Sequence, residues 1–270
     1  MPKPLANINV VELTTTVAGP AAGAMLADYG ATVVKVEPKQ GDSFRNIMGA
    51  IGAAAQATAF KKSPFFYCIN RGKMSVVLDL KSQHGRAQLH TMLELADVFI
   101  SNNRQPALAK LGLDADSLRK RHPHLVVCAM TGYGRTGPDA ALPGYDVGVF
   151  YARSGLANAF HASHPKYGDP TALFPPSLPA GAGDMVTSMS AVTGICAALV
   201  DKQRTGQGRI VETSLLRSGL WTNMWALQST LHTGRPFLAR ARTSRFNPAL
   251  NSYRAGDGKV FWLLGMEVRV

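Results

Sequence analysis

The sequence predicts an α/β fold: a doubly wound, mostly parallel sheet flanked by helices, in a Rossmann-like large domain. Residues 9–14 (NVVELT), 21–29 and 31–37 (ATVVKVE) follow each other as strand, helix and strand, which is a βαβ unit. The later predicted strands are continuously apolar, as parallel strands buried on both faces are. The turn at 15–19 therefore follows the carboxyl end of the first strand, where such folds bind ligands.

Turn and helix signals define the elements of the first half of the chain. Gly19-Pro20 starts the first helix, since proline is favoured in a first helical turn, and Gly30 ends it. Residues 40–64 are rich in glycine and alanine without a clear period, which predicts a loop with helical pieces. Apolar runs predict strands at 76–80, 97–101 and 125–131, and helical spacing predicts helices at 85–96, 106–111 and 114–121.

A long apolar helix dominates the second half. It begins at Asp184 and is expected to run for about four turns before the break at 204–208 (RTGQG). Its predicted buried face consists of Met185, Met189, Val192, Cys196 and Leu199. The other elements predicted here are helices at 145–160 and 213–232, the second burying Leu216, Leu220, Met224 and Leu227, a Pro-rich loop at 161–179, and strands at 210–212 and 260–264.

The chain is expected to divide into a large α/β domain at 1–232 and an incomplete second domain. Residues 233–270 are predicted to be a linker and the beginning of this smaller domain. Residues 234–251 are basic and irregular, and the strand at 260–264 has no partner after it. We therefore expect a truncated chain.

A net charge of +12 on 270 residues predicts an anionic partner. Nucleic acid is disfavoured, because no zinc-finger, helix-turn-helix or RNP-like pattern accompanies the dispersed basic residues. No apolar run reaches transmembrane length and no secretory signal precedes the first strand, which predicts a cytoplasmic protein without a membrane partner. Several cations that converge on one multiply charged small molecule fit the composition best.

Three isolated cysteines indicate a reducing compartment. Cys68, Cys128 and Cys196 each stand alone in apolar sequence, and no Cys-x-x-Cys pair is present. This pattern argues against a disulfide framework and against a zinc site. We expect no bound metal, and we expect all three cysteines in the core.

Residues 132–137 (GYGRTG) match a dinucleotide-binding pattern but are not expected to act as one. That pattern requires a helix to open at once, so that its N–H groups face a pyrophosphate. Here Pro138 and Pro143 interrupt the next residues, and Asp146 lies too close to be the ribose-binding acid. We expect instead a turn that lets a ligand approach closely.

Asp184 has two interpretations from the residues alone. Aspartate is a preferred helix N-cap, and a Gly-Asp pair before an apolar helix is usually a cap. An acid that follows the small residues 181–183, at the start of a buried helix, is also well placed for chemistry. Taken by itself, the pattern favours the cap.

Five stretches occur in one order: residues 9–37, 70–82 (NRGKMSVVLDLKS), 96–113, 130–147 (with MTGYGRTGP and GYDV) and 183–216. Together they resemble the class III CoA-transferases, which include formyl-CoA transferase, the carnitine and bile-acid CoA-transferases and α-methylacyl-CoA racemase. The resemblance covers nearly the whole chain. Members of this family are longer, with a second, smaller domain, and their two chains interlock, so the resemblance also implies a homodimer.

The resemblance implies that Asp184 is the catalytic nucleophile, and this role then takes precedence over capping. In the family the equivalent aspartate attacks an acyl-CoA thioester, expels CoA thiolate and becomes an acyl-aspartyl anhydride. The thiolate then forms an aspartyl-CoA thioester, and an acceptor acid takes the CoA. Covalent steps replace one difficult exchange, and the distant nucleotide holds the thioester in place. The small residues 181–183 would leave room and N–H groups for the oxyanion.

The resemblance also implies a coenzyme A site, with acyl-CoA as a substrate and no permanently bound cofactor. Lysine and arginine would neutralise the phosphates of CoA. The family often has a basic residue directly after the second strand; this chain has Pro38 there, and Lys39, the next residue, is expected to take its place. Taken singly, each cation is more often a solvated surface charge. The implied CoA contacts are Val17, Ala18, Lys39, Leu78, Lys81, Asn102, Asn103, Arg104, Lys110, Tyr145 and Asp146.

Tyr145 distinguishes transfer from racemisation within the family. Racemases carry a histidine at this position, which forms a His/Asp pair for α-proton transfer. A tyrosine with an ordinary pKa of about 10 is a poor base at neutral pH. We therefore expect transfer of CoA from an acyl-CoA to a small carboxylic acid. The alternatives are a racemase or another CoA-ester enzyme, and a noncatalytic protein that binds CoA or nucleic acid.

Overall fold

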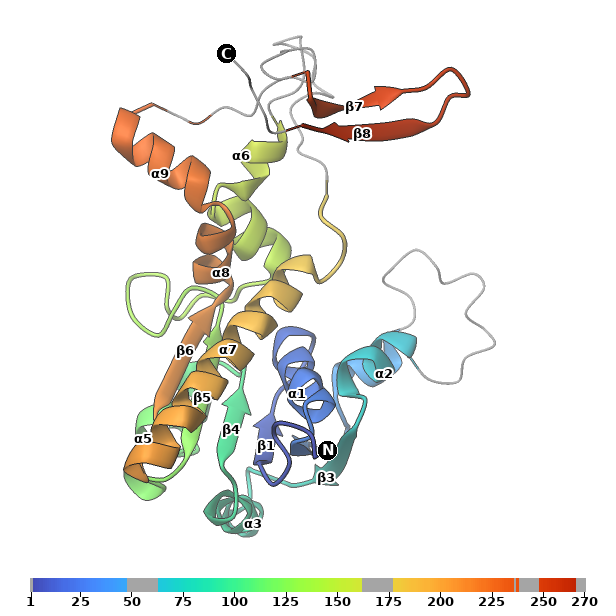
Figure 1. The fold of residues 1–270 in the computed structure, drawn as a ribbon. Coiled ribbons are helices and arrows are strands. Elements are labelled where there is room, and N and C mark those ends of the chain that lie inside the picture. Colours follow the sequence, from blue (N-terminus) through green and yellow to red (C-terminus); the bar gives the residue numbers. More distant parts are fainter. Residues whose placement is uncertain (1, 48–62, 162–176, 236, 238–247, 266–270) are drawn as a thin grey trace. The chain divides into compact units, whose positions relative to one another are not determined.

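The computed structural model describes residues 2–47, 63–161, 177–235, 237 and 248–265 (Figure 1). The chain forms two compact units, Met1–Leu156 with Ser177–Asn223, and Ala157–Pro176 with Met224–Val270. The unit around the sheet thus ends at Asn223, and the predicted domain boundary between 232 and 233 stays a prediction. Most of the predicted loops at 40–64 and 161–179 lie outside the described residues.

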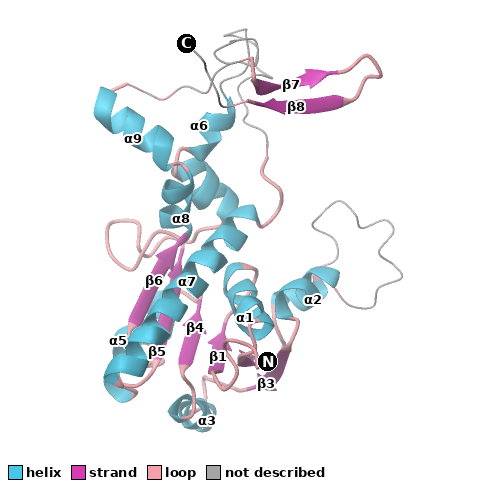
Figure 2. Ribbon diagram, viewed as in Figure 1, coloured by secondary structure: helices cyan, strands magenta, loops and turns pink. Residues whose placement is uncertain are grey.

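Six parallel strands form the sheet of the first unit (Figure 2). Their order, β3-β2-β1-β4-β5-β6, is the doubly wound arrangement and confirms the predicted fold. The order reverses between β1 and β4, where Val10 lies opposite Val98. The strands are β1 (Asn9–Leu13), β2 (Thr32–Glu37), β3 (Lys73–Val77), β4 (Val98–Ser101), β5 (Val126–Thr131) and β6 (Ile210–Ser214).

Helices cover both faces of this sheet. Val10 packs in a core with α1 and α7, and its neighbour Val11 packs in a second core with α3, α4 and α5, because alternate side chains of a strand point to opposite faces. The helices of this unit are α1 (Ala18–Asp28), α2 (Pro64–Asn70), α3 (Gln83–Glu94), α4 (Gln105–Ala109), α5 (Ala115–Arg121), α7 (Ala182–Thr205) and α8 (Leu215–Thr222), with a π-helix at Val147–Arg153. The helix α6 (Leu156–His161) belongs to the second unit apart from its first residue.

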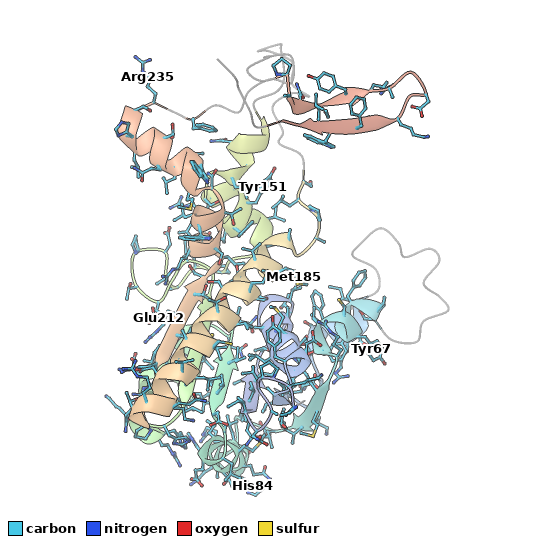
Figure 3. The ribbon with its side chains drawn as sticks, viewed as in Figure 1. Tyr67, His84, Tyr151, Met185, Glu212 and Arg235 are labelled. Carbon is cyan, nitrogen blue, oxygen red and sulfur yellow. The ribbon has the colours of Figure 1, made fainter. Side chains whose placement is uncertain are left out.

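The helix α7 is longer than predicted, with 24 residues, and its buried face differs. Val192 and Leu199 are buried as expected, but Met185 and Met189 are exposed. Figure 3 labels Met185 near the start of α7. The predicted face is wrong in its first half because α1, which packs against α7, consists mainly of alanine and glycine. The two helices therefore approach through small residues such as Ala191. By length and composition α7 could also cross a membrane, but here it packs as a core helix.

The second unit contains α9 (Met224–Thr233), β7 (Leu250–Arg254) and β8 (Val260–Leu264). The predicted helix at 213–232 breaks at Asn223, which caps α8. Met224 and Leu227 are exposed, so their predicted burial is wrong; no residue of α9 is buried in the described chain. The strand β8 does have a partner, but the partner precedes it: β7 pairs with it antiparallel.

Two smaller predictions also have clear outcomes. Cys128 is buried, whereas Cys68 is exposed on the short helix α2, so the expectation that every cysteine lies in the core is wrong. The glycines at 132–137 form a turn, with φ of 108° at Gly134 and 96° at Gly137, and no helix opens before residue 147. The rejection of the dinucleotide-binding pattern is therefore confirmed.

Candidate active site

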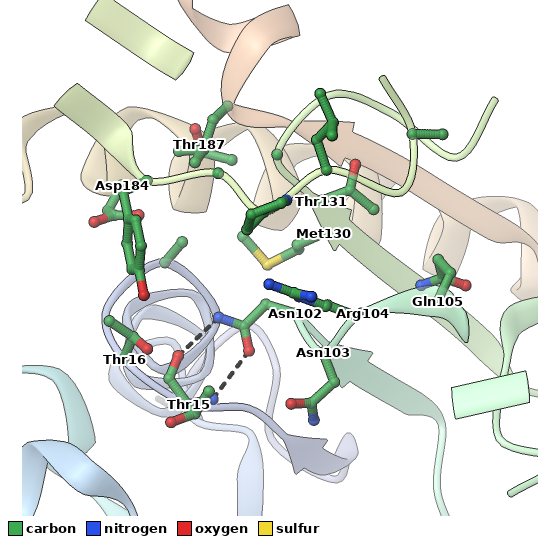
Figure 4. Close-up of a pocket in the computed structure, with 18 of the residues that line it drawn as sticks. Thr15, Thr16, Asn102, Asn103, Arg104, Gln105, Met130, Thr131, Asp184 and Thr187 are labelled. Carbon is green, nitrogen blue, oxygen red and sulfur yellow. Dashed lines mark hydrogen bonds between the residues drawn. The ribbon is translucent and has the colours of Figure 1, made fainter. Parts of the chain in front are cut away.

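A pocket of about 260 Å³ lies at the carboxyl ends of β1, β4 and β5 (Figure 4). The turn after β1, the segment after β4 and the turn after β5 form its walls, together with the first turn of α7. It therefore occupies the point where the strand order reverses, which is where a doubly wound sheet binds its ligand. The sequence predicted this position from the turn at 15–19.

Asp184 is the third residue of α7, and it lines this pocket. The N-cap of the helix is Gly181, whose φ of 75° is left-handed and suits glycine. The interpretation of Asp184 as an N-cap is therefore wrong. Within the described residues its half-buried carboxyl has no hydrogen-bond partner, so it is available to a ligand.

Burial raises the pKa of the Asp184 carboxyl to about 7, and the negative charge of Asp146 adds to this shift. The N-terminus of a helix acts in the opposite direction, because it favours a carboxylate, but burial outweighs it here. Asp146 accepts a hydrogen bond from the N–H of Val147 at 2.8 Å with its Oδ1, while its buried Oδ2 has no hydrogen-bond partner among the described residues. A carboxyl that lies in a pocket and has its pKa raised towards neutral pH is typical of a catalytic group.

Ser188 joins the helix of Asp184 to the turn after β1. Its buried Oγ lies 2.7 Å from the carbonyl oxygen of Ala18 and 2.7 Å from that of Asp184. Ala18 begins α1 and lines the pocket. The hydroxyl therefore fixes the spacing between the carboxyl and the opposite wall. Sequence reasoning missed Ser188, whose only signal is its place one helical turn after Asp184.

Asn102 and Asn103 hold the backbone of β1 and of the turn that follows it. Asn102 accepts from the N–H of Thr15 at 2.9 Å and donates to the carbonyl of Thr15 at 2.7 Å (Figure 4). Asn103 donates to the carbonyl of Leu13 at 2.9 Å. Thr16, which follows Thr15 in this turn, has a strained φ of 67° and also lines the pocket. The two side-chain amides thus shape the pocket by holding the end of β1 and the turn after it in place.

The glycine-rich start of α7 serves packing. A Cβ on Gly183 would lie 2.5 Å from Cγ of Phe150, so the ring occupies the space beside this residue. The small residues 181–183 were expected to leave space for an oxyanion, but beside Gly183 the ring of Phe150 fills that space. Ala182 and Met185 donate their N–H groups to the carbonyl oxygens of Pro179 and Gly181, so the N–H groups of Gly183 and Asp184 remain as donors in this turn.

A buried group of charges lies behind the turn after β1. Lys35 Nζ is 3.4 Å from Glu12 Oε1 and 2.9 Å from Asp42 Oδ2, and all three side chains are inaccessible. Thr15 Oγ1 donates to Asp42 Oδ1 at 3.3 Å, which connects this group to the pocket wall. Lys73 pairs with Glu12 at 2.9 Å, and burial lowers its pKa to about 8. Sequence reasoning missed these contacts, because Glu12 and Lys35 lie within strands predicted from their apolar residues, whereas Asp42 and Lys73 lie outside the predicted strands.

The structure brings only part of the predicted CoA site together. The side chains of Lys39, Lys81 and Lys110 are exposed outside the pocket, Leu78 packs in the core, and Asp146 is not part of the lining. CoA contacts at these positions stay predictions. The predicted residues that line the pocket with Asp184 are Val17, Ala18, Asn102, Asn103, Arg104 and Tyr145.

The chain is similar to proteins of one family. Residues 5–269 match the profile described as CoA-transferase family III. The chain is 33% identical to cinnamoyl-CoA:phenyllactate CoA-transferase of Clostridium sporogenes, over 93% of this chain and 58% of that protein. It is 34% identical to succinate–glutarate CoA-transferase of Agrobacterium fabrum, over 98% and 64% of the two chains. The chain therefore spans about three fifths of the length of these relatives.

A solved structure gives the same result for the fold. The crystal structure of a CaiB/BaiF family protein from Brucella suis matches with a TM-score of 0.81 and 27% sequence identity. The match covers 98% of this chain and 66% of that one.

Proposed function

Because the chain belongs to CoA-transferase family III, we propose that it transfers CoA from an acyl-CoA to a carboxylic acid, with Asp184 as the nucleophile. The single observation that carries this proposal is the position of Asp184, a carboxyl with a raised pKa in the pocket at the reversal of strand order. Relatives with 33 and 34% identity are named as CoA-transferases.

In the proposed reaction, first the acyl group and then CoA is bound covalently to Asp184. A carboxylate oxygen of Asp184 attacks the thioester carbonyl and the C–S bond breaks. CoA departs as the thiolate, and a mixed anhydride between the acyl group and Asp184 is formed. The thiolate attacks the aspartyl carbonyl and releases the donor acid, which gives an aspartyl-CoA thioester. The acceptor carboxylate attacks this thioester, the C–S bond breaks, and CoA thiolate is expelled as a second anhydride forms between the acceptor and Asp184. The thiolate then attacks the acceptor carbonyl of this anhydride, which gives the acceptor CoA ester and frees the Asp184 carboxylate. Each step exchanges one acyl bond for another, so no external energy source is needed.

The pocket suits the thioester end of such a substrate. Its volume of about 260 Å³ is below that of pockets which enclose a whole drug-sized ligand. Arg104 lines the pocket with an exposed guanidinium that has no ion-pair partner in the described chain, and it is the cation placed to meet a phosphate. Tyr145, in the same lining, favours transfer over racemisation because it is a poor base at neutral pH.

A homodimer forms part of the proposal. Met185 and Met189 of α7 are 39% and 57% exposed, which leaves an apolar strip beside the pocket. Exposed strips of this kind are typical of interaction surfaces. We also propose a cytoplasmic location, on the sequence argument alone.

Trapping with hydroxylamine tests the proposed function. The chain is incubated with an acyl-CoA and then with hydroxylamine, and the peptide that contains Asp184 is analysed by mass spectrometry. We expect a hydroxamate at Asp184, none in Asp184→Asn, and an unchanged yield in Asp201→Asn, a control on the same helix outside the pocket. CoA binding without any adduct would support the noncatalytic alternative.

A further inference from the structure

A second pocket, of about 270 Å³, lies between α3 and α5 on the face of the sheet opposite α7. It shares no lining residue with the pocket of Asp184. Its polar side chains are Gln83, Arg86, His90 and Arg121, and none of its lining residues is acidic. The pocket therefore concentrates positive charge.

The two arginines of this pocket are not neutralised. Arg86 Nη1 donates to the carbonyl oxygens of Leu80 and Lys81 at 3.0 and 2.9 Å, which fixes the plane of the guanidinium. Its remaining N–H groups have no partner among the described residues, and neither Arg86 nor Arg121 forms an ion pair there. An oriented guanidinium with free donors is the group that binds oxyanions in pairs of hydrogen bonds.

His90 adds a buried donor to the pocket. It is 7% exposed, and its Nδ1 lies 3.0 Å from Nε2 of His122, with the two rings stacked. The other ring nitrogen, Nε2, has no partner in the described part of the chain. Burial lowers the pKa of His90, and so do the charges of Arg121, His122 and Arg86, while Glu94 opposes them. An anion in the pocket would offset these cations.

We propose that this pocket binds an oxyanion of the phosphate type, held by Arg86, Arg121 and the Nε2–H of His90. Free phosphate and a terminal phosphate monoester of a larger ligand share this chemistry. Binding selects the tautomer of His90 with its proton on Nε2, so Nδ1 accepts a hydrogen bond from His122. It also raises the pKa of His90 towards its ordinary range.

An NMR titration of the whole chain with labelled histidines tests the proposal. Inorganic phosphate is added at constant ionic strength, and we expect saturable shifts of the His90 and His122 ring signals together with a raised pKa of His90. Arg121→Gln should weaken phosphate binding roughly tenfold. Lys120→Gln removes the same charge from the adjacent exposed position of α5 and should leave the affinity unchanged.

A second titration separates the two sources of phosphate. Shifts of His90 with coenzyme A that vanish with its dephospho form would assign the phosphate to that ligand, and shifts with inorganic phosphate alone would assign a free anion. No saturable shift with either, or equal weakening by both variants, would overturn the proposal. The adduct at Asp184 is a separate readout, so each proposal fails independently of the other.

Discussion

The Ser188 hydroxyl lies 2.7 Å from the carbonyl oxygen of Ala18, and this contact joins the helix of the candidate nucleophile to the opposite wall of the pocket. The two residues are 170 positions apart in the sequence. A short polar side chain of α7 thus links the helix that carries Asp184 to the segment after β1.

Loss of this contact should affect both stability and binding. In Ser188→Ala the buried carbonyl of Ala18 loses the hydrogen bond that joins α7 to α1, which should destabilise the fold by about 1 kcal/mol. It should also weaken CoA binding, because the pocket wall is released. Thr193→Ala is the control, since Thr193 is exposed and, among the described residues, donates only to its own helix at Met189. Chemical denaturation and CoA titration measure the two effects, and equal results for both variants would contradict this role.

Asp146 should set the pH at which Asp184 becomes reactive. Its negative charge raises the pKa of Asp184, so Asp146→Asn should lower that pKa below the value of about 7. The nucleophile is the ionised carboxylate, so the rate of adduct formation should rise with pH through this value in the wild type. The variant should reach half of its maximum at a lower pH. Asparagine caps a helix as well as aspartate does, so the local fold should persist. An unchanged or higher midpoint would exclude this coupling.

Asp184 itself should reduce stability at neutral and alkaline pH. Its pKa is raised from 3.8 to about 7 in the folded state, so between these values the folded chain retains a proton that the unfolded chain has lost. Stability therefore falls as the pH rises through this window, and the full cost is present above it. Asp184→Asn should be more stable than the wild type by ~2 kcal/mol at pH ~8, after a discount for partial exposure, and nearly equal at pH ~4. Unfolding curves at the two pH values measure this difference, and a constant offset would contradict it.

Gly183 should not tolerate a side chain. An added Cβ would lie 2.5 Å from Cγ of Phe150, whose ring is buried, so Gly183→Ala should cost about 1–3 kcal/mol and displace the start of α7. Gly148→Ala is the matched control, because no atom of the described residues would lie within 4 Å of its added Cβ. Thermal unfolding compares the two variants. A Gly183→Ala protein as stable as the control would show that the ring moves freely.

The sequence predicted the sheet, the order of its elements and the position of the pocket, because each depends on local patterns. Strand β3 was displaced in the prediction, from 73–77 to 76–80, since Lys73 looks like a surface residue until Glu12 is placed beside it. The predicted buried face of α7 was wrong in its first half, because hydrophobic periodicity does not show that α7 packs against α1 through small residues. Ser188 and Asn102 act on backbone groups far along the chain, and no local pattern reports such contacts.

The most direct measurement of the central claim follows oxygen from the acceptor acid to Asp184. Turnover of an acyl-CoA with an acceptor whose carboxylate carries heavy oxygen should transfer one heavy oxygen to the Asp184 carboxyl in each cycle, because the anhydride with the acceptor breaks on the acceptor side. Mass spectrometry of the peptide that contains Asp184 detects this label. We expect the label at Asp184 and at no other acid. Formation of the acceptor CoA ester without any label at Asp184 would contradict a covalent role for this residue.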